Sequence, residues 1–212
     1  MPEVKICGNR RREDIEYASE ADFLGFVIQI RESPRSLTIE EAKPLMAQAQ
    51  GYGQTVAVVN MFDVDFLSDM CSALDPDYVQ LQAELPSSKL LELKDLLDAQ
   101  VIAHVSPTQG AVERADALAE VADVIAVDTV VDGAIGGTGK THDWELSRSV
   151  RDAVYPAKLM LSGGLNCQNV ESAIAAVMPS IVDVSSGVEE NGRKSKELVS
   201  SFIRKAKEAG NG

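Results

Sequence analysis

The chain has 212 residues, of which 45% are hydrophobic and 25% are charged, a composition typical of a globular protein rather than a disordered or fibrous one. Its 20 Lys and Arg against 33 Asp and Glu give a formal net charge of −13, which argues against nucleic acid or an anionic membrane as a partner. The three cysteines are odd in number and lack metal-ligand spacing, so neither a disulfide framework nor a zinc site is expected.

The chain shows no sign of membrane insertion or export. No run approaches about 18 consecutive apolar residues, and the N-terminus mixes acidic and basic residues where a secretory signal needs an apolar core. We therefore expect a cytoplasmic protein with no membrane partner. The acidic excess fits solvated acidic faces, and a salt-rich cytoplasm is the less ordinary alternative.

Short β-branched runs alternate along the chain with longer segments whose apolar residues recur every three or four positions. In chain order the expected strands are VKIC (4–7), FLGFVI (23–28), TVAVVN (55–60), YVQL (78–81), VIAHVS (101–106), VIAVDT (124–129), KLMLSG (158–163) and IVDVSS (181–186). The expected helices that follow them are 12–21, 38–49, 63–74, 89–99, 109–121, 144–154, 168–178 and 195–209. Thr38 and Asp63 are suited to cap two of these helices.

Eight strand–helix units fill the chain, and length alone would allow one large domain or two small ones. The strands are nearly continuous in Val, Ile, Leu and Ala, as expected where both faces of a parallel sheet are covered. A doubly wound open sheet would more usually have five or six strands. The pattern therefore predicts an α/β fold, a single (β/α)8 TIM barrel spanning residues 1–212 as one domain.

Chemistry in such barrels lies where the strands end. Because side chains alternate along a strand, Lys5 and Cys7 share the inward face of the first strand, and Asp128 and Asp183 are inward on the sixth and eighth. An ammonium beside a thiol favours the thiolate, which can act as a general base, and a facing carboxylate would supply the acid. The alternatives are a small buried Cys7 and structural carboxylates.

Glycine-rich stretches follow the last three strands. SGGL (162–165) and SSGV (185–188) lie at the usual phosphate position of this fold, with ordinary turn glycines as the alternative. GGTGKTHDW (136–144) lacks the spacing of a nucleotide-binding P-loop, and its length predicts a mobile lid. The predicted phosphate-binding residues are Gly137, Gly163, Gly164, Ser185, Ser186 and Gly187.

After the second strand, SPRSL (33–37) holds Arg35 in a loop stiffened by Pro34. A forked guanidinium there is suited to bind a carboxylate, and an exposed surface arginine is the equal alternative.

These stretches together resemble the phosphoribosylanthranilate isomerase family of tryptophan biosynthesis. The matching motifs are KICG (5–8), SPR (33–35), VN (59–60), VQL (79–81), GGTGKTHDW (136–144), SGGLNCQNV (162–170) and DVSSGVE (183–189). The resemblance implies a barrel that performs an Amadori rearrangement on N-(5-phosphoribosyl)anthranilate without metal or cofactor. The expected partner is thus a small phosphorylated sugar, and the protein is expected to be a monomer or a homodimer.

The resemblance also implies roles for single residues. Asp128 falls on the general acid that protonates the furanose ring oxygen, and Cys7 falls on the general base that removes the C2′ proton. Arg35 corresponds to the anthranilate carboxylate contact and Asp183 to a polar contact with the sugar and amine. The backbone of the SGGL and SSGV stretches corresponds to the phosphate site.

One departure from the family falls after the fourth strand, where QLQAE (80–84) replaces the usual QLHG. Gln82 can hydrogen-bond the substrate but cannot take a proton near neutral pH. His104 is expected to be a core histidine more often than a site residue. The alternatives left open are a divergent paralogue acting on another phosphorylated aminoaldose and a phosphate-ligand-binding homologue without turnover.

Overall fold

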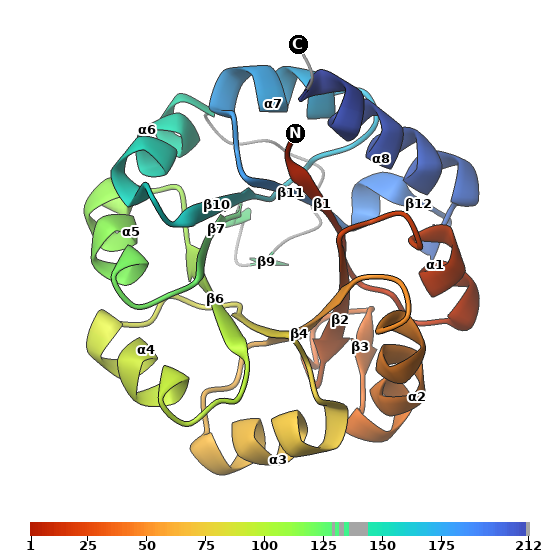
Figure 1. Ribbon diagram of the computed structural model, residues 1–212, viewed down its shortest axis with the longest axis horizontal. Helices are drawn as coiled ribbons and strands as arrows, with labels where there is room; N and C mark the ends of the chain where they lie inside the picture. Colours follow the sequence, from red (N-terminus) through yellow and green to blue (C-terminus); the bar gives the residue numbers. More distant parts are fainter. Residues whose placement is uncertain (129, 132–133, 136–143, 211–212) are drawn as a thin grey trace.

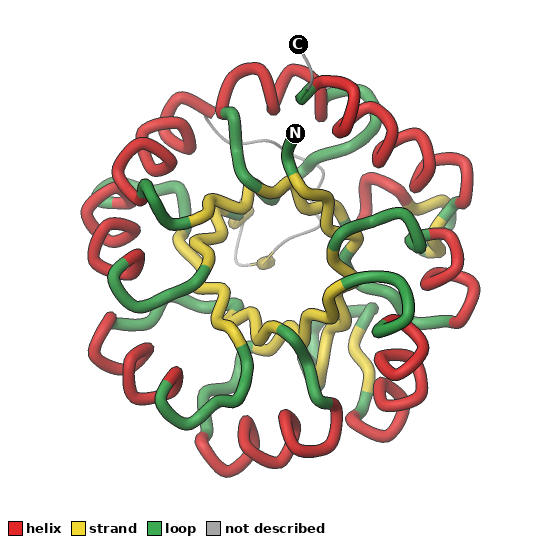
Figure 2. Tube along the Cα trace, in the orientation of Figure 1, coloured by secondary structure: helices red, strands yellow, loops and turns green. Residues whose placement is uncertain are grey.

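A computed structural model describes residues 1–128, 130–131, 134–135 and 144–210. Within these ranges, eight parallel strands form a closed barrel surrounded by helices, as Figures 1 and 2 show, so the predicted fold is confirmed. The barrel strands are β1 (Glu3–Ile6), β2 (Phe23–Ile28), β4 (Gln54–Val59), β5 (Tyr78–Leu81), β6 (Gln100–Val105), β7 (Val124–Val127), β10 (Lys158–Leu161) and β11 (Ile181–Val184).

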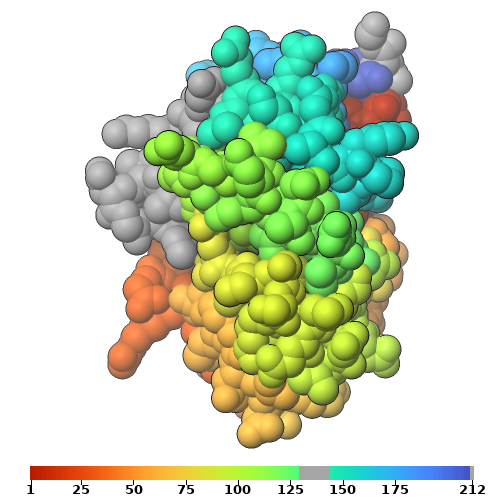
Figure 3. Space-filling view, turned by 90° about the vertical axis from the view of Figure 1, so that its left-hand side faces the viewer, coloured from red at the N-terminus to blue at the C-terminus, as the bar shows by residue number. Residues whose placement is uncertain are grey.

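The helices follow the strands in the predicted order. They are α1 (Arg12–Tyr17), α2 (Ile39–Ala49), α3 (Val64–Leu74), α4 (Ser87–Lys94), α5 (Ala111–Ala119), α6 (Trp144–Val154), α7 (Val170–Val177) and α8 (Lys196–Ala209). Figure 3 shows α4, α5 and α6 packed side by side on one flank. No helix among the described ranges is long and apolar enough to cross a membrane.

Both predicted helix caps are present. The Thr38 hydroxyl accepts a hydrogen bond from the Glu41 amide at 3.2 Å, while the Glu41 carboxylate accepts from the Thr38 amide at 2.9 Å. The Asp63 carboxylate accepts from the Phe66 amide at 2.9 Å. The reciprocal pair at α2 and the single bond at α3 satisfy amides that have no partner inside the helix and so fix where these helices begin.

Several element boundaries differ from the prediction. The strands expected at 124–129, 158–163 and 181–186 end at Val127, Leu161 and Val184, where the loops of the barrel mouth begin. The fourth helix begins earlier than expected, directly after Pro86, whose fixed φ and missing amide suit a helix start. The predicted loop at 136–143 lies outside the described residues.

Short strands not predicted from the sequence extend the loops. β3 (Ser36–Leu37) pairs with β2, and β8 (Val130–Val131) pairs with β9 (Ala134–Ile135). The hairpin of β12 (Glu189–Glu190) and β13 (Arg193–Lys194) turns through Asn191 and Gly192, which have φ values of 51° and 72°. An Asn-Gly pair is the common turn for two positive φ values, so this hairpin had a sequence signal.

Two apolar layers flank the strands. Val4, Ile6 and Leu24 face the helices, whereas the barrel interior holds Cys7, Phe23, Val27, Val56, Val58, Tyr78, Ile102, Val124, Ala126, Met160 and Ile181. The predicted alternation therefore holds, with Cys7 on the inward face. At the end of the barrel opposite the mouth, the rings of Phe23 and Tyr78 pack edge to face with centroids 5.4 Å apart.

Gly187 allows the loops after β10 and β11 to pack closely. A β-carbon there would fall on the Leu165 carbonyl oxygen and within 2.9 Å of the Asn166 β-carbon. We expect Gly187→Ala to destabilise the fold by about 1–3 kcal/mol, seen as a lower midpoint of thermal unfolding. The matched control is Gly51→Ala, whose β-carbon would lie at an ordinary contact distance of 3.5 Å from the Gln48 carbonyl oxygen. Equal midpoints for the two variants would contradict this packing argument.

Candidate active site

A cavity opens at the carboxyl ends of the strands. It has about 790 Å³ of empty space, including the part that is open to solvent. Among the predicted site residues, its lining includes Cys7, Arg35, Gln82, Asp128, Gly163, Gly164, Asp183, Ser185 and Ser186. Gly187 does not line the cavity, and Gly137 lies outside the described residues. Side chains that are remote in sequence thus meet at one barrel mouth.

Lys5 and Asp183 form a buried ion pair inside the barrel. The two residues are register partners between β1 and β11, and the Lys5 ammonium donates to Asp183 Oδ1 at 3.0 Å. The Ser162 hydroxyl donates to Asp183 Oδ2 at 3.2 Å. Burial alone would lower the pKa of Lys5, but the Asp183 carboxylate and, after it, the neighbouring Cys7 raise it above its ordinary value. Lys5 is therefore a buried cation whose principal partner is Asp183.

Cys7 follows at the end of β1, where its amide donates to the Val184 carbonyl at 2.8 Å. Burial raises the pKa of the Cys7 thiol, and the opposing charges of Lys5 and Lys194 do not outweigh it. Lys5 thus favours the thiolate, as expected, but the net effect of the surroundings favours the thiol. Space for both side chains comes from Gly25 on β2, where a β-carbon would lie 2.9 Å from Cys7 Sγ and 3.1 Å from Lys5 Cε.

A chain of hydrogen bonds from two glutamines reaches Asp128 across the barrel mouth. The Gln80 amide donates to Gln82 Oε1 at 2.8 Å, and the Gln82 amide donates to Asp128 Oδ2 at 3.2 Å. Because Gln80 occupies the Gln82 oxygen, the nitrogen of Gln82 is turned toward the carboxylate. All three side chains are buried. Gln80, which sequence reasoning did not select, therefore orients the residue that contacts Asp128.

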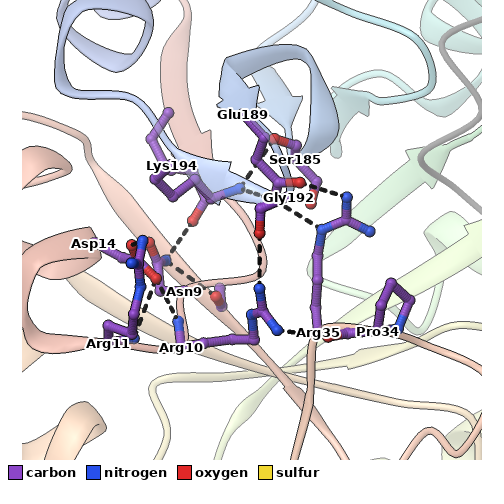
Figure 4. A network of polar contacts seen from close by, with 12 residues as sticks. Asn9, Arg10, Arg11, Asp14, Pro34, Arg35, Ser185, Glu189, Gly192 and Lys194 are labelled. Atoms are coloured by element: carbon purple, nitrogen blue, oxygen red, sulfur yellow. Dashed lines mark hydrogen bonds and ion pairs between the residues drawn. The ribbon is translucent and has the colours of Figure 1, made fainter.

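Arg35 is held by an acidic side chain from the loop after β11. Its Nε and Nη2 donate to the two carboxylate oxygens of Glu189 at 2.8 and 2.7 Å. Lys194 donates to Glu189 Oε1 at 3.0 Å and to the Ser185 carbonyl at 2.9 Å, as Figure 4 shows. Burial alone would raise the pKa of Glu189, but hydrogen bonds and charges from Arg35 and Lys194 lower it to about 2. Burial lowers the pKa of Lys194.

The expected phosphate loops meet beside this cluster. Gly163 and Gly164 have φ values of 88° and 66°, a backbone that side chains strongly disfavour. Within the part of the chain that the structure describes, their amides donate to no protein acceptor. Such amides suit an anion, because backbone N–H groups from a glycine-rich turn can converge on it.

His104 is a buried histidine outside this cavity. Its Nε2 lies 3.2 Å from the Ser106 hydroxyl, and burial lowers its pKa. This environment fits the core role that was the more expected of the two. No group of three or more His, Cys, Asp or Glu that could hold a metal occurs among the residues described.

Comparisons with known proteins agree on one family. The family model described as N-(5′phosphoribosyl)anthranilate (PRA) isomerase matches residues 4–205. The N-(5′-phosphoribosyl)anthranilate isomerase of Methanothrix thermoacetophila is 37% identical over 209 residues, covering 98% of this chain and 99% of the relative.

Two solved structures are similar over the whole barrel. One is phosphoribosyl anthranilate isomerase in complex with reduced 1-(o-carboxyphenylamino)-1-deoxyribulose 5-phosphate, with a TM-score of 0.82 and 34% identity. The other contains monomers generated from the dimeric enzyme of Thermotoga maritima, with a TM-score of 0.84 and 34% identity. Each alignment covers 98% of this chain and 100% of the other.

The raised pKa of Cys7 predicts how the thiol is alkylated. We expect iodoacetamide to label Cys7 more slowly at pH 7.5 than free cysteine, because the thiolate is the nucleophile. The rate should rise about tenfold per pH unit up to the thiol pKa, which separates ionisation from mere inaccessibility. Peptide mass spectrometry after timed quenching gives the rate at each cysteine. Labelling of Cys7 that is fast and constant from pH 6 to 9 would show a resting thiolate instead.

Proposed function

Since the chain belongs to the N-(5′-phosphoribosyl)anthranilate isomerase family, we propose that the cavity at its barrel mouth is the catalytic site of this isomerase. The enzyme acts in tryptophan biosynthesis and converts N-(5-phosphoribosyl)anthranilate into 1-(2-carboxyphenylamino)-1-deoxyribulose 5-phosphate. This Amadori rearrangement opens the ribose ring and moves the carbonyl from C1′ to C2′. It needs one acid, one base and two anion sites, and the observation that carries the proposal is their convergence in one cavity.

The substrate has an anion at each end. The phosphate is held by the free amides of Gly163 and Gly164 together with the Ser185–Ser186 turn. The anthranilate carboxylate is bound by Arg35. The Nε hydrogen of Arg35 and one hydrogen of its Nη2 are donated to Glu189. The end-on edge, formed by Nη1 and the other hydrogen of Nη2, is left to form a second bidentate contact with the substrate carboxylate. Local donors thereby bind the two anionic groups of the substrate in a chain whose net charge is −13.

Asp128 and Cys7 carry the two proton transfers. Asp128 donates a proton to the furanose oxygen as the C1′–O bond breaks, and the nitrogen lone pair forms a cationic Schiff base. The Cys7 thiolate then removes the C2′ proton, and the C–H electrons neutralise the iminium to give an enolamine that tautomerises to the product. The iminium charge favours the thiolate as it is needed, which offsets the effect of burial.

Gln82 takes part as a donor to Asp128 rather than as a proton carrier. It replaces the histidine usual in the family, and its amide cannot be protonated near neutral pH. Proton transfer therefore runs directly from Asp128 to the ring oxygen, with Gln82 fixing the direction of the carboxyl group. Asp183 holds Lys5 and contributes a polar contact at the sugar.

The setting of the enzyme is a further part of the proposal. We propose a single-domain cytoplasmic enzyme, monomeric or homodimeric, that binds no nucleic acid. The net charge of −13 and the dimeric state of the related Thermotoga maritima enzyme support these statements. Light scattering on the purified protein at several concentrations distinguishes a monomer from a homodimer.

Removing either proton-transfer residue should abolish most of the activity. We expect Cys7→Ala and Asp128→Asn each to lower kcat by about 10²–10⁴, the usual contribution of a general acid or base. Turnover is followed as loss of fluorescence of freshly generated phosphoribosylanthranilate. Cys71→Ala is the matched control, because this cysteine lies on α3 and does not line the cavity. Near-normal turnover of either variant, with the control unchanged, would remove that residue from the mechanism.

The contact between Gln82 and Asp128 predicts a graded effect. We expect Gln82→Leu to lower kcat about tenfold to hundredfold with little change in KM, because the hydrogen bond that stabilises the negative charge developing on Asp128 as its proton leaves is lost. Gln82→His retains a ring N–H donor and should lose less than about threefold. The same assay measures both. Equal losses in the two variants would mean that the shape of the Gln82 side chain matters rather than its donor.

A further inference from the structure

The geometry points to Glu189 as a positioning residue that aims Arg35 at the substrate carboxylate. It binds the side-on edge of the guanidinium and leaves the end-on edge of Arg35, a residue that lines the cavity, for another partner. This inference rests on the proposed role of Arg35. Glu189 need not touch the substrate, and its contact with Arg35 gives a reason why the substrate carboxylate is recognised.

The contact restrains Arg35 in direction as well as in place. A guanidinium is a rigid fork, so two parallel hydrogen bonds of 2.8 and 2.7 Å fix its plane and its rotation about Cδ–Nε. A free arginine has several rotatable bonds whose freedom is lost on binding a ligand. An arginine already held in one orientation loses less, and the ligand binds more tightly for that reason.

Glu189 is itself fixed. Its carboxylate is mostly buried and also accepts from Lys194, which is its register partner in the β12–β13 hairpin. Lys194 in turn holds the Ser185 carbonyl on the loop expected to bind phosphate. The cluster of Arg35, Glu189 and Lys194 therefore joins the two ends of the substrate site.

Charge does not argue against this role. Glu189 is shared between two basic side chains, so its single negative charge cannot neutralise both. With its pKa lowered to about 2, Glu189 stays ionised throughout the neutral range. Arg35, whose pKa is raised mainly by its hydrogen bonds to Glu189, stays charged.

Arg10 forms a second link between the segments that carry Arg35 and Glu189. The Arg10 guanidinium donates to the Pro34 carbonyl at 2.7 Å and to the Gly192 carbonyl at 2.8 Å (Figure 4). These acceptors belong to the two segments that the Arg35–Glu189 pair joins, the loop after β2 and the hairpin. The two segments are thus tied at two points, which restrains Arg35 from both its backbone and its side chain.

The test compares two ligands that differ only in the carboxylate. The probes are reduced 1-(o-carboxyphenylamino)-1-deoxyribulose 5-phosphate and the same molecule without its carboxyl group. Calorimetry gives the Kd of each, and the ratio of the two Kd values measures carboxylate recognition separately from any general damage to the site. We expect the wild-type protein to bind the carboxylate probe about tenfold to hundredfold more tightly, as for a bidentate contact with a charged group.

Glu189→Gln should bring this ratio to within about threefold of unity, because one amide oxygen cannot hold both edge nitrogens of Arg35. Glu189→Gln also leaves the buried Lys194 without a carboxylate, which threatens the fold. The double variant Glu189→Gln with Lys194→Met removes both charges and should show the same loss of discrimination. Lys194→Met alone keeps the Arg35–Glu189 pair and should keep the wild-type ratio, even where both Kd values rise.

Arg35→Met separates failure of this inference from failure of the proposed function. A wild-type ratio in Arg35→Met would refute Arg35 as the carboxylate contact, and the role of Glu189 would fall with it. Loss of discrimination in Arg35→Met, with an unchanged or larger ratio in both folded Glu189 variants, would overturn the positioning role alone. Loss in Arg35→Met and in both Glu189 variants, with discrimination kept in Lys194→Met, supports it.

Discussion

The buried ion pair between Lys5 and Asp183 is the contact on which the site depends. It spans the seam where β1 and β11 close the barrel, and an ammonium can stay there only with a partner. A shift of register by one residue would place Lys5 opposite Val182 or Val184 and leave its charge unpaired inside the protein. The pair thus favours one alignment of the seam, and that alignment sets the position of Cys7 two residues further on.

The barrel and most of its inward side chains could be predicted because they follow local rules. Eight alternations of a period-two and a period-3.6 pattern indicate the fold, and strand alternation alone places Cys7, Asp128 and Asp183 on the inner face. Strand alternation could not decide the partner of Lys5, because it places both candidate carboxylates, Asp128 and Asp183, on the inner face. The Asp183 carboxylate lies 178 residues away, and only the closed ring brings the two together.

The cluster of Arg35, Glu189 and Lys194 likewise contains a contact that the sequence could not predict. Arg35 and Glu189 both lie in short motifs visible in the sequence, but they are 154 residues apart, and no pattern pairs them. The hairpin that carries Glu189 and Lys194 did have a local signal, the Asn191–Gly192 turn. Gln80 had no such local signal. A glutamine within a strand is an ordinary polar residue in the sequence, and only the folded barrel shows that Gln80 contacts Gln82, which in turn contacts Asp128.

The seam of the barrel also has a consequence for how the polypeptide folds as it is made. Lys5 leaves the ribosome 178 residues ahead of Asp183, which emerges only after nearly all of the sheet has been synthesised. Until then the ammonium remains in water, and the first strand lacks one of its two neighbours. The nascent chain can collapse around its early helices, but the ring with its paired charge forms late, since contacts this distant in sequence require the intervening chain to be ordered first.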